Sequence, residues 1–265
     1  MRVTPHHDLG SGRICTPSRP AGYGDGVQVH LVVAPVFATN CAVVVDADAD
    51  ADASRGADAV VVDAGAGVAA TVTRLVAEHG WNVRAVLATH GHVDHTWDAA
   101  ALCETFGVPL RVHAADAYRL ADPFGTLGLT GGGVSDALRQ ALAGLGLRAE
   151  DYRAPADVVP FDADGDDGAG TIEAGTVRLR VIHAPGHTEG STLYGLDGVL
   201  LAGDVLFAGG IGRTDLPGGD DAVMRVTLRD VVGRLDAGLE VVPGHGPTTT
   251  VARELATNPY LPPAG

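Results

Sequence analysis

Lysine is absent from this 265-residue sequence, so arginine supplies all 18 basic side chains against 33 acidic ones. The formal net charge is −15. A nucleic-acid binder needs a basic face to meet phosphates, and this composition argues against that class of protein. The acidity says little about small-molecule substrates, because a bound metal ion reverses the local electrostatic field.

Cysteine is also scarce. The three cysteines, Cys15, Cys41 and Cys103, lie far apart and form no CxxC pair. This spacing indicates neither a disulfide framework nor a thiolate zinc site, and a reducing cytoplasm is the simplest interpretation. Residues 1–10 contain no apolar run, so no signal peptide is expected. No stretch approaches the roughly 20 apolar residues of a membrane helix, so no membrane partner is expected.

Hydrophobic residues make up 46% of the chain, which is enough for a sizeable core. Apolar runs alternate with segments of helical spacing, and this alternation predicts the α/β class in one domain spanning residues 1–265. The predicted strands are Val27–Phe37, Cys41–Val45, Ala59–Val62, Val83–Ala88, Leu110–Val112, Val177–Ile182, Thr192–Tyr194, Val199–Leu201 and Glu240–Val242. The predicted helices are Thr71–Glu78, Ala99–Phe106 and Asp221–Leu235, the last with Asp220 or Asp221 as N-cap.

Two segments interrupt this pattern. Asp46–Asp58 alternates Asp and Ala, which is typical of a solvated hairpin loop without a function of its own. Asp122–Gly170 is longer and contains a glycine cluster, a helical patch and an acidic turn. A lid over a site and a surface insertion are equally good interpretations of this second segment.

One motif carries most of the chemical signal: Thr89-His90-Gly91-His92-Val93-Asp94-His95. It directly follows a predicted strand, and α/β sheets usually place ligands at the carboxyl ends of their strands. In extended backbone, His90 and His92 point to the same side and can hold one metal ion. Asp94 and His95 can then hold a second ion. Imidazole and carboxylate ligands suit zinc, manganese and iron.

Three further predicted strands end in a potential metal ligand. His187 follows one in Ala184-Pro185-Gly186-His187-Thr188, Asp204 follows another, and His245 follows a third in Pro243-Gly244-His245-Gly246. One aspartate or histidine at a strand end is unremarkable. Together with the strand before the His90 motif, four strand ends in one chain carry such residues, and this indicates a common metal site. The glycine beside each histidine lets the backbone turn sharply.

The ordered set His90-x-His92-x-Asp94-His95, His187, Asp204 and His245 resembles the ligand signature of the metallo-β-lactamase superfamily. The resemblance runs from about Val27 to the C-terminus. It implies an αββα sandwich in which two mixed β-sheets are flanked by helices. It also implies two Zn²⁺ per chain. One would be held by His90, His92 and His187, the other by Asp94, His95 and His245, with Asp204 between them.

Within that superfamily, Gly212-Arg213-Thr214-Asp215 and the Pro243–Thr250 segment resemble glyoxalase II-like proteins. That group implies a hydroxyacylglutathione hydrolase-like enzyme. Such an enzyme cleaves a thioester such as S-lactoylglutathione, or another acyl-thiol, by a metal-bound hydroxide. The resemblance implies that Asp94 both ligates a metal and orients the nucleophile. Only about 20 residues follow His245, so the C-terminal helical domain of the eukaryotic enzymes is not expected, and the thiol partner stays open.

Two alternatives share this scaffold. Persulfide dioxygenases resemble the chain nearly as well and would bind one Fe²⁺ through His90, His187 and Asp204. A lactonase or another ester hydrolase would use the same hydroxide. Arg213 is expected either to pair with Asp215 or to bind a substrate carboxylate. The oligomeric state is left open by the sequence.

Overall fold

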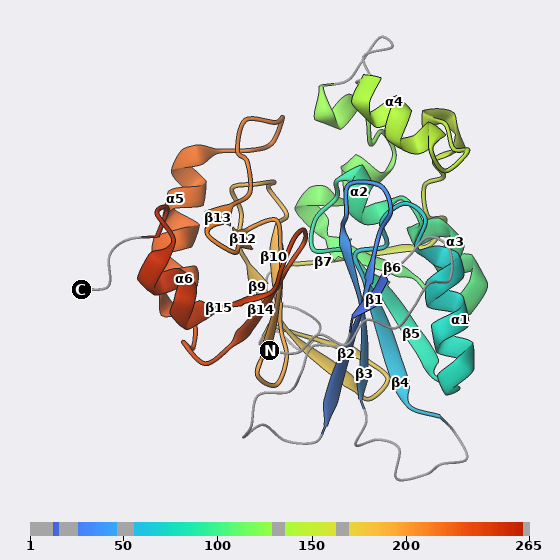
Figure 1. The fold of residues 1–265 in the computed structure, drawn as a ribbon, viewed down its shortest axis with the longest axis horizontal. Helices are drawn as coiled ribbons and strands as arrows, with labels where there is room; N and C mark the ends of the chain where they lie inside the picture. Colours follow the sequence, from blue (N-terminus) through green and yellow to red (C-terminus); the bar gives the residue numbers. More distant parts are fainter. Residues whose placement is uncertain (1–12, 16–25, 47–55, 129–135, 163–169, 262–265) are drawn as a thin grey trace.

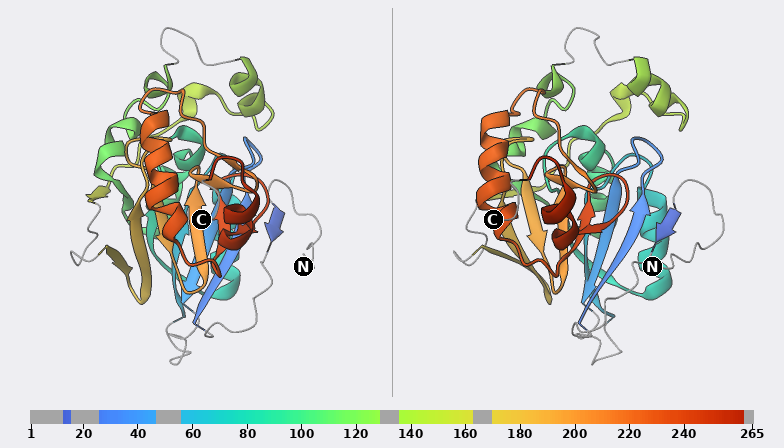
Figure 2. Two further views of the ribbon diagram at one scale, coloured as in Figure 1. Left: turned by 90° about the vertical axis from the view of Figure 1, so that its left-hand side faces the viewer. Right: turned by 60° about the vertical axis from the view of Figure 1, so that its left-hand side comes forward.

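The computed structural model describes residues 13–15, 26–46, 56–128, 136–162 and 170–261. Two β-sheets pack face to face in it, and helices cover the outer face of each sheet (Figure 1). The two side views in Figure 2 show the same four layers, with α5 and α6 outside the second sheet. The predicted α/β class and αββα sandwich are therefore confirmed.

The first sheet has seven strands in the order β1-β2-β3-β4-β5-β6-β7. Strands β1 to β4 pair antiparallel and β4 to β7 pair parallel. Its strands are β1 (Arg13–Cys15), β2 (Val27–Val33), β3 (Asn40–Asp46), β4 (Asp58–Val62), β5 (Asn82–Leu87), β6 (Leu110–His113) and β7 (Val158–Phe161). Helices α1 (Ala69–His79) and α3 (Ala99–Phe106) cover its outer face.

The second sheet has six strands in the order β15-β14-β11-β10-β9-β8, and a two-stranded ribbon, β12–β13, lies beside it. These strands are β8 (Thr171–Ala174), β9 (Val177–His183), β10 (Thr192–Gly195), β11 (Val199–Gly203), β12 (Leu206–Phe207), β13 (Gly210–Ile211), β14 (Glu240–Pro243) and β15 (Thr249–Thr250). Helices α5 (Asp221–Asp230) and α6 (Val251–Thr257) cover its outer face.

Alternation of apolar side chains along the strands explains why both sheet faces are buried. In β4, Val60 and Val62 point between the sheets, whereas Ala59 and Val61 point toward α1 and α3. Successive strand residues face opposite sides, so a continuous apolar run is what a doubly covered sheet requires. Tyr194 lies in the layer between the sheets, fully buried, and its hydroxyl donates to the Ala88 carbonyl at 2.9 Å.

Two predicted elements end earlier than expected. The strand that begins at Val27 stops at Val33, because Phe37 and Ala38 adopt left-handed backbone angles in the turn to β3. Helix α5 begins at the expected Asp220 N-cap but stops at Asp230, and a short 3₁₀ turn follows over Val232–Arg234. Two adjacent valines and a glycine weaken helix propensity at that point.

Residues 122–170, the lid or insertion of the sequence analysis, are described except for 129–135 and 163–169. They contain a 3₁₀ turn (Gly125–Leu127), α4 (Asp136–Ala143), a second turn (Ala149–Asp151) and the edge strand β7. Leu142 is fully buried in a small apolar cluster with Trp97 and Val93, beside the metal-ligand motif. A role as a lid stays a prediction.

The central part of the predicted Asp46–Asp58 hairpin loop lies outside the described residues. Among the helices in the described ranges, none has the length and apolar character that crossing a lipid bilayer requires.

Candidate metal centre

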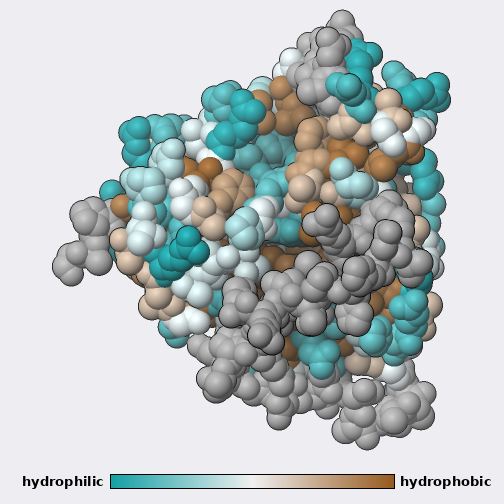
Figure 3. Space-filling model, in the orientation of Figure 1, coloured by the Kyte–Doolittle hydropathy of each residue, from teal (hydrophilic) through white to brown (hydrophobic). Residues whose placement is uncertain are grey.

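The seven predicted ligands meet at one edge of the sandwich because four strands end there. The motif with His90, His92, Asp94 and His95 follows β5, and the other three follow β9, β11 and β14. A short helix, α2 (Val93–Thr96), carries Asp94 and His95. On the face shown in Figure 3, hydrophilic residues line a hollow between the two halves of the molecule. The predicted convergence of these side chains is what the structure shows.

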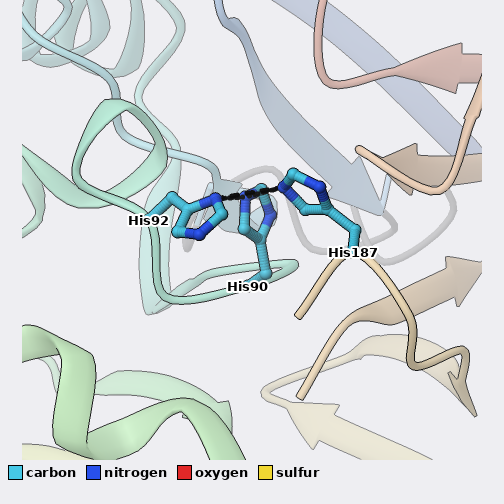
Figure 4. Close-up of side chains that lie close together, drawn as sticks. All are labelled: His90, His92 and His187. Atoms are coloured by element: carbon cyan, nitrogen blue, oxygen red, sulfur yellow. Dashed lines mark hydrogen bonds between the residues drawn. The ribbon is translucent and has the colours of Figure 1, made fainter. Parts of the chain in front are cut away.

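Three histidines form the first group, and their rings converge on one point (Figure 4). His90 Nε2 lies 3.1 Å from His92 Nδ1 and 3.2 Å from His187 Nε2. His187 Nε2 lies 3.0 Å from His92 Nδ1. All three side chains are buried, although His187 lies 97 positions after His90 in the chain.

Asp94, His95 and His245 form the second group. His95 Nε2 lies 3.2 Å from His245 Nε2 and 3.7 Å from Asp94 Oδ2, and His245 Nε2 lies 3.3 Å from Asp94 Oδ2. His95 is fully buried, whereas His245 is a quarter exposed. This group therefore lies nearer the solvent than the first.

Asp204 lies between the two groups. Its Oδ1 is 3.4 Å from His95 Nε2, and its Oδ2 is 3.5 Å from His245 Nε2 and 3.7 Å from His187 Nε2. One carboxylate thus contacts histidines of both groups, as the bridging position implied by the family resemblance requires.

Groups behind the rings orient four of the histidines. His187 Nδ1 donates to the Arg213 carbonyl at 2.7 Å, and His245 Nδ1 donates to the Phe37 carbonyl at 2.9 Å. His95 Nδ1 faces Asp63 Oδ2 at 3.0 Å, and His90 Nδ1 faces the Thr89 hydroxyl at 3.2 Å. A proton on each outer nitrogen leaves the lone pair of each Nε2 aimed inward, as in metal-ligating histidines.

Burial keeps the first group neutral. It lowers the pKa of His92 to about 3 and holds the pKa of His90 well below its ordinary value, and the neighbouring histidines lower both further. Burial also lowers the pKa of His187, against the opposing effect of Asp204. A neutral imidazole is the form that binds a metal ion.

The second group is dominated by its carboxylates. Burial lowers the pKa of His245, but hydrogen bonds to Asp204 and Asp94 outweigh it and raise that pKa to about 9. Burial likewise opposes charge on His95, yet Asp63, Asp204 and Asp94 raise its pKa well above the usual value. The same contacts hold the pKa values of Asp94 and Asp204 low despite burial. This half of the site favours a positive charge.

The donor set fits a pair of transition-metal ions. In the first group, the ring nitrogens of three neutral imidazoles converge at 3.0 to 3.2 Å from one another. A tetrahedral zinc ion with bonds of 2.0 to 2.1 Å separates its ligands by about 3.3 Å, close to this spacing. Imidazole and carboxylate are also suitable ligands for iron.

Two further polar side chains lie around the site, and one of them, Arg213, has an expected role from the sequence. Arg213 pairs with Asp215 through two contacts of 2.7 Å, as expected for a brace, and both side chains are exposed. Asn40 donates to the carbonyls of Pro243 and Gly246 and so holds the turn that carries His245.

Two buried aspartates were missed in the sequence. Asp63 accepts from the Thr89 backbone and hydroxyl and faces His95. It ends an apolar strand beside Ala64 and Gly65, a signal like that of Asp204. Asp116 lies in a 3₁₀ helix (Ala114–Leu120), where no sequence pattern marks it.

Comparison with known proteins agrees with this geometry. The family described as the metallo-beta-lactamase superfamily matches residues 34–245, so the chain belongs to that superfamily. An uncharacterized protein of Mycobacterium tuberculosis is 36% identical over 202 residues, covering 74% of this chain and 83% of that one. Hydroxyacylglutathione hydrolase GloC of Haemophilus influenzae is 27% identical and covers 89% of this chain and 98% of its own.

Solved structures of similar proteins share the fold. The BLEG-1 B3 metallo-β-lactamase has a TM-score of 0.65 and 28% identity, covering 89% of this chain and 99% of that one. The protein TTHA1623, solved in a di-iron-bound form, has a TM-score of 0.59 and 26% identity, covering 92% and 100%. The chain is therefore a member of a superfamily of metallo-hydrolases, and its histidine-rich site is one for divalent metal ions.

Proposed function

We propose that the chain is a two-zinc hydrolase that cleaves an acyl-thioester. In this proposal His90, His92 and His187 would hold one ion, Asp94, His95 and His245 would hold the other, and Asp204, which lies between the two groups, would contribute to both. The observation that carries the proposal is the convergence of three ring nitrogens at 3.0 to 3.2 Å in a buried, neutral cluster. This spacing matches the separation of nitrogen ligands around one zinc ion.

The chain's own residues account for the catalytic steps beyond metal binding. Two zinc ions, when bound, make hydroxide available at neutral pH and polarise a carbonyl group. Asp94, whose pKa is held low, accepts a hydrogen bond from the attacking water and fixes its direction. The second group is open to solvent where His245 is a quarter exposed, which gives a small substrate access, and a thiolate leaves without much help from an acid.

Two observations favour the thioester. Relatives named hydroxyacylglutathione hydrolase are 27% and 35% identical to the chain, and the Gly212–Asp215 segment lies directly on the site. There the Arg213 carbonyl accepts from His187, so this segment contributes to the metal centre itself. A substrate role for the exposed Arg213 side chain stays a prediction, as does the identity of the thiol.

The test combines elemental analysis with a substrate panel on the same preparation. Thioesters of several thiols, among them S-lactoylglutathione, are compared with a lactone and with glutathione persulfide under oxygen. We expect two zinc ions per chain and thioester cleavage. One iron per chain with oxygen uptake would overturn the proposal and assign the dioxygenase chemistry, and lactone cleavage alone would assign an ester hydrolase.

His92→Ala and Asp204→Ala provide the matching loss-of-function test. Both are expected to lose metal and nearly all turnover while the fold persists. His79→Ala is the control, because His79 is exposed at the end of α1, where its ring stacks on Trp81 and lies 6.1 Å from the His30 ring. Full activity of either ligand variant without bound metal would refute the proposal.

A further inference from the structure

Asp116 is a fully buried carboxylate that accepts four hydrogen bonds. Its Oδ2 accepts from the Gly91 backbone at 2.8 Å and from the Thr188 hydroxyl at 2.7 Å. Its Oδ1 accepts from the Gly190 backbone at 2.9 Å and from Arg119 Nε at 3.3 Å. Every acceptor site of this side chain is directed at a backbone or side chain close to the metal centre.

Three of these partners, Gly91, Thr188 and Gly190, belong to the two loops that carry the first group of histidines. Gly91 stands between His90 and His92, and Thr188 follows His187. One loop leaves β5 of the first sheet and the other leaves β9 of the second. Asp116 therefore joins two segments from opposite sheets within one or two residues of the three rings that must converge.

Packing around Asp116 leaves no freedom in this arrangement. A Cβ at Gly91 would lie 2.8 Å from the Asp116 carbonyl oxygen, and a Cβ at Gly190 would lie 2.7 Å from Asp116 Cγ. Both glycines let the loop backbones approach the carboxylate closely enough to donate to it. A small movement of Asp116 would thus shift both loops together.

The charge of Asp116 is balanced inside the protein by Arg119, which is also fully buried. Arg119 pairs with Glu189 and donates to the Pro217 carbonyl at 3.1 Å and the Thr126 carbonyl at 3.4 Å. A buried charge pair with all its hydrogen bonds made is rigid, and it is costly to break from one side.

The second group has a different carboxylate behind it. Asp63 Oδ1 accepts from the Thr89 backbone at 2.7 Å, and Asp63 Oδ2 lies 3.0 Å from His95 Nδ1. Asp63 has a left-handed backbone angle, φ 61°, and no direct contact between it and His92 or His187 is found in the described ranges. Asp63 also reaches His90 indirectly, because the Thr89 hydroxyl donates to Asp63 Oδ2 at 2.8 Å and lies 3.2 Å from His90 Nδ1. Asp63 therefore supports His95 directly and His90 through Thr89, whereas the hydrogen bonds that Asp116 accepts in the described ranges come from the loops of the first group and from Arg119.

We propose that Asp116 is a positioning residue for the first group only, so that it sets the affinity of one metal ion independently of the other. This inference rests on the proposed two-metal function. Outer carboxylates of this kind change metal affinity by about 10- to 100-fold when removed. Asp116→Asn is therefore expected to raise the dissociation constant of one metal ion by that factor. The dissociation constant of the other ion should stay within about threefold of the wild-type value. Asp63→Asn is expected to weaken the binding of the other ion most, because Asp63 faces His95 directly and His90 only through Thr89.

The experiment titrates metal-free protein with Zn²⁺ in the presence of a chromophoric chelator and extracts two dissociation constants. Asp122→Asn is the matched control, because Asp122 also accepts from a backbone N–H, that of Gly125, but is exposed and away from the rings. This control should keep both wild-type constants.

A double-variant cycle identifies which ion responds. In a variant that already carries His92→Ala, the first group binds its metal ion only weakly. Adding Asp116→Asn should then leave the remaining tight constant unchanged, whereas adding Asp63→Asn should weaken it. Equal weakening of both ions by Asp116→Asn, or of neither, would overturn the inference while leaving the two-metal function standing. Fewer than two tight ions in the wild type would instead overturn the proposed function.

Asp116→Asn removes the charge of one of the two carboxylates that Arg119 contacts, and the variant has the risk of failing to fold. In that case Thr188→Val tests the role of Asp116. It removes one hydrogen bond to Asp116 but keeps the carboxylate and its ion pair with Arg119. We expect it to weaken the same single ion several-fold. Unchanged constants in a folded Thr188→Val protein would contradict the role assigned to Asp116.

Discussion

Replacing Gly244 with alanine is expected to disable the metal centre through a single added methyl group. A Cβ at Gly244 would lie 2.1 Å from Asp204 Oδ1 and 2.7 Å from His95 Cε1. Carbon and oxygen in close non-bonded contact stay about 3.3 Å apart, so the Asp204 carboxylate must move by about 1 Å. The backbone cannot yield easily, because Gly244 is hydrogen-bonded to Asn40 and Gly203 at 2.7 Å.

The size of the effect follows from that displacement. Overpacking of this kind costs about 1–3 kcal/mol of folding stability, which a domain of this size tolerates. A misplacement of about 1 Å costs roughly 100-fold in turnover. Because Asp204 contacts both groups of histidines, both metal ions are expected to bind more weakly.

Gly246→Ala is the matched control on the other side of His245. Gly246 has a left-handed angle, φ 78°, and no heavy atom lies within 4 Å of an added Cβ. The substitution should cost about 1 kcal/mol of stability through backbone strain and keep both metals. Zinc content after dialysis, thioester turnover and urea unfolding are measured on both variants. Wild-type zinc content and turnover in Gly244→Ala would refute this account of how Asp204 and His95 are packed.

Three further predictions follow from residues around the site. Burial and the nearby His183 lower the pKa of His113 below its usual 6.5, so its contribution to stability is present above pH 6.5 and is lost as the pH falls. His113→Asn, which keeps an acceptor for the Ala115 N–H, should therefore reduce the stability lost by metal-free protein between pH 7.5 and 5.5, and an unchanged loss would contradict this. Ala38→Gly relieves a left-handed angle, φ 56°, and should raise the free energy of unfolding in urea by about 0.5–1 kcal/mol. Arg213→Ala should leave folding unchanged, since exposed ion pairs contribute little, and a KM increase without a kcat change would assign the side chain to substrate binding.

The fold and the candidate ligands could be predicted from the sequence because they depend on local patterns. Continuous apolar runs marked strands that are buried on both faces, and a histidine or aspartate directly after such a run marked the ligand. His187, Asp204 and His245 were found in this way, although no local feature shows that their strands end at the same edge.

Other features depend on contacts that only the folded chain makes. Asp116 lies in a 3₁₀ helix with no periodic pattern, and three of its four partners are 25 to 74 positions away. The left-handed angles of Phe37 and Ala38, which end β2, are imposed by the turn that brings the Phe37 carbonyl to His245. Neither a propensity nor a motif encodes such distant hydrogen bonds.

The central claim is that side chains between positions 90 and 245 hold two metal ions. The most direct measurement is anomalous diffraction at the zinc edge from crystals of zinc-reconstituted protein. The account predicts two peaks about 3.5–4 Å apart. One should lie among His90, His92 and His187, and the other among Asp94, His95 and His245. A single peak, or zinc bound elsewhere with the histidine cluster empty, would contradict it.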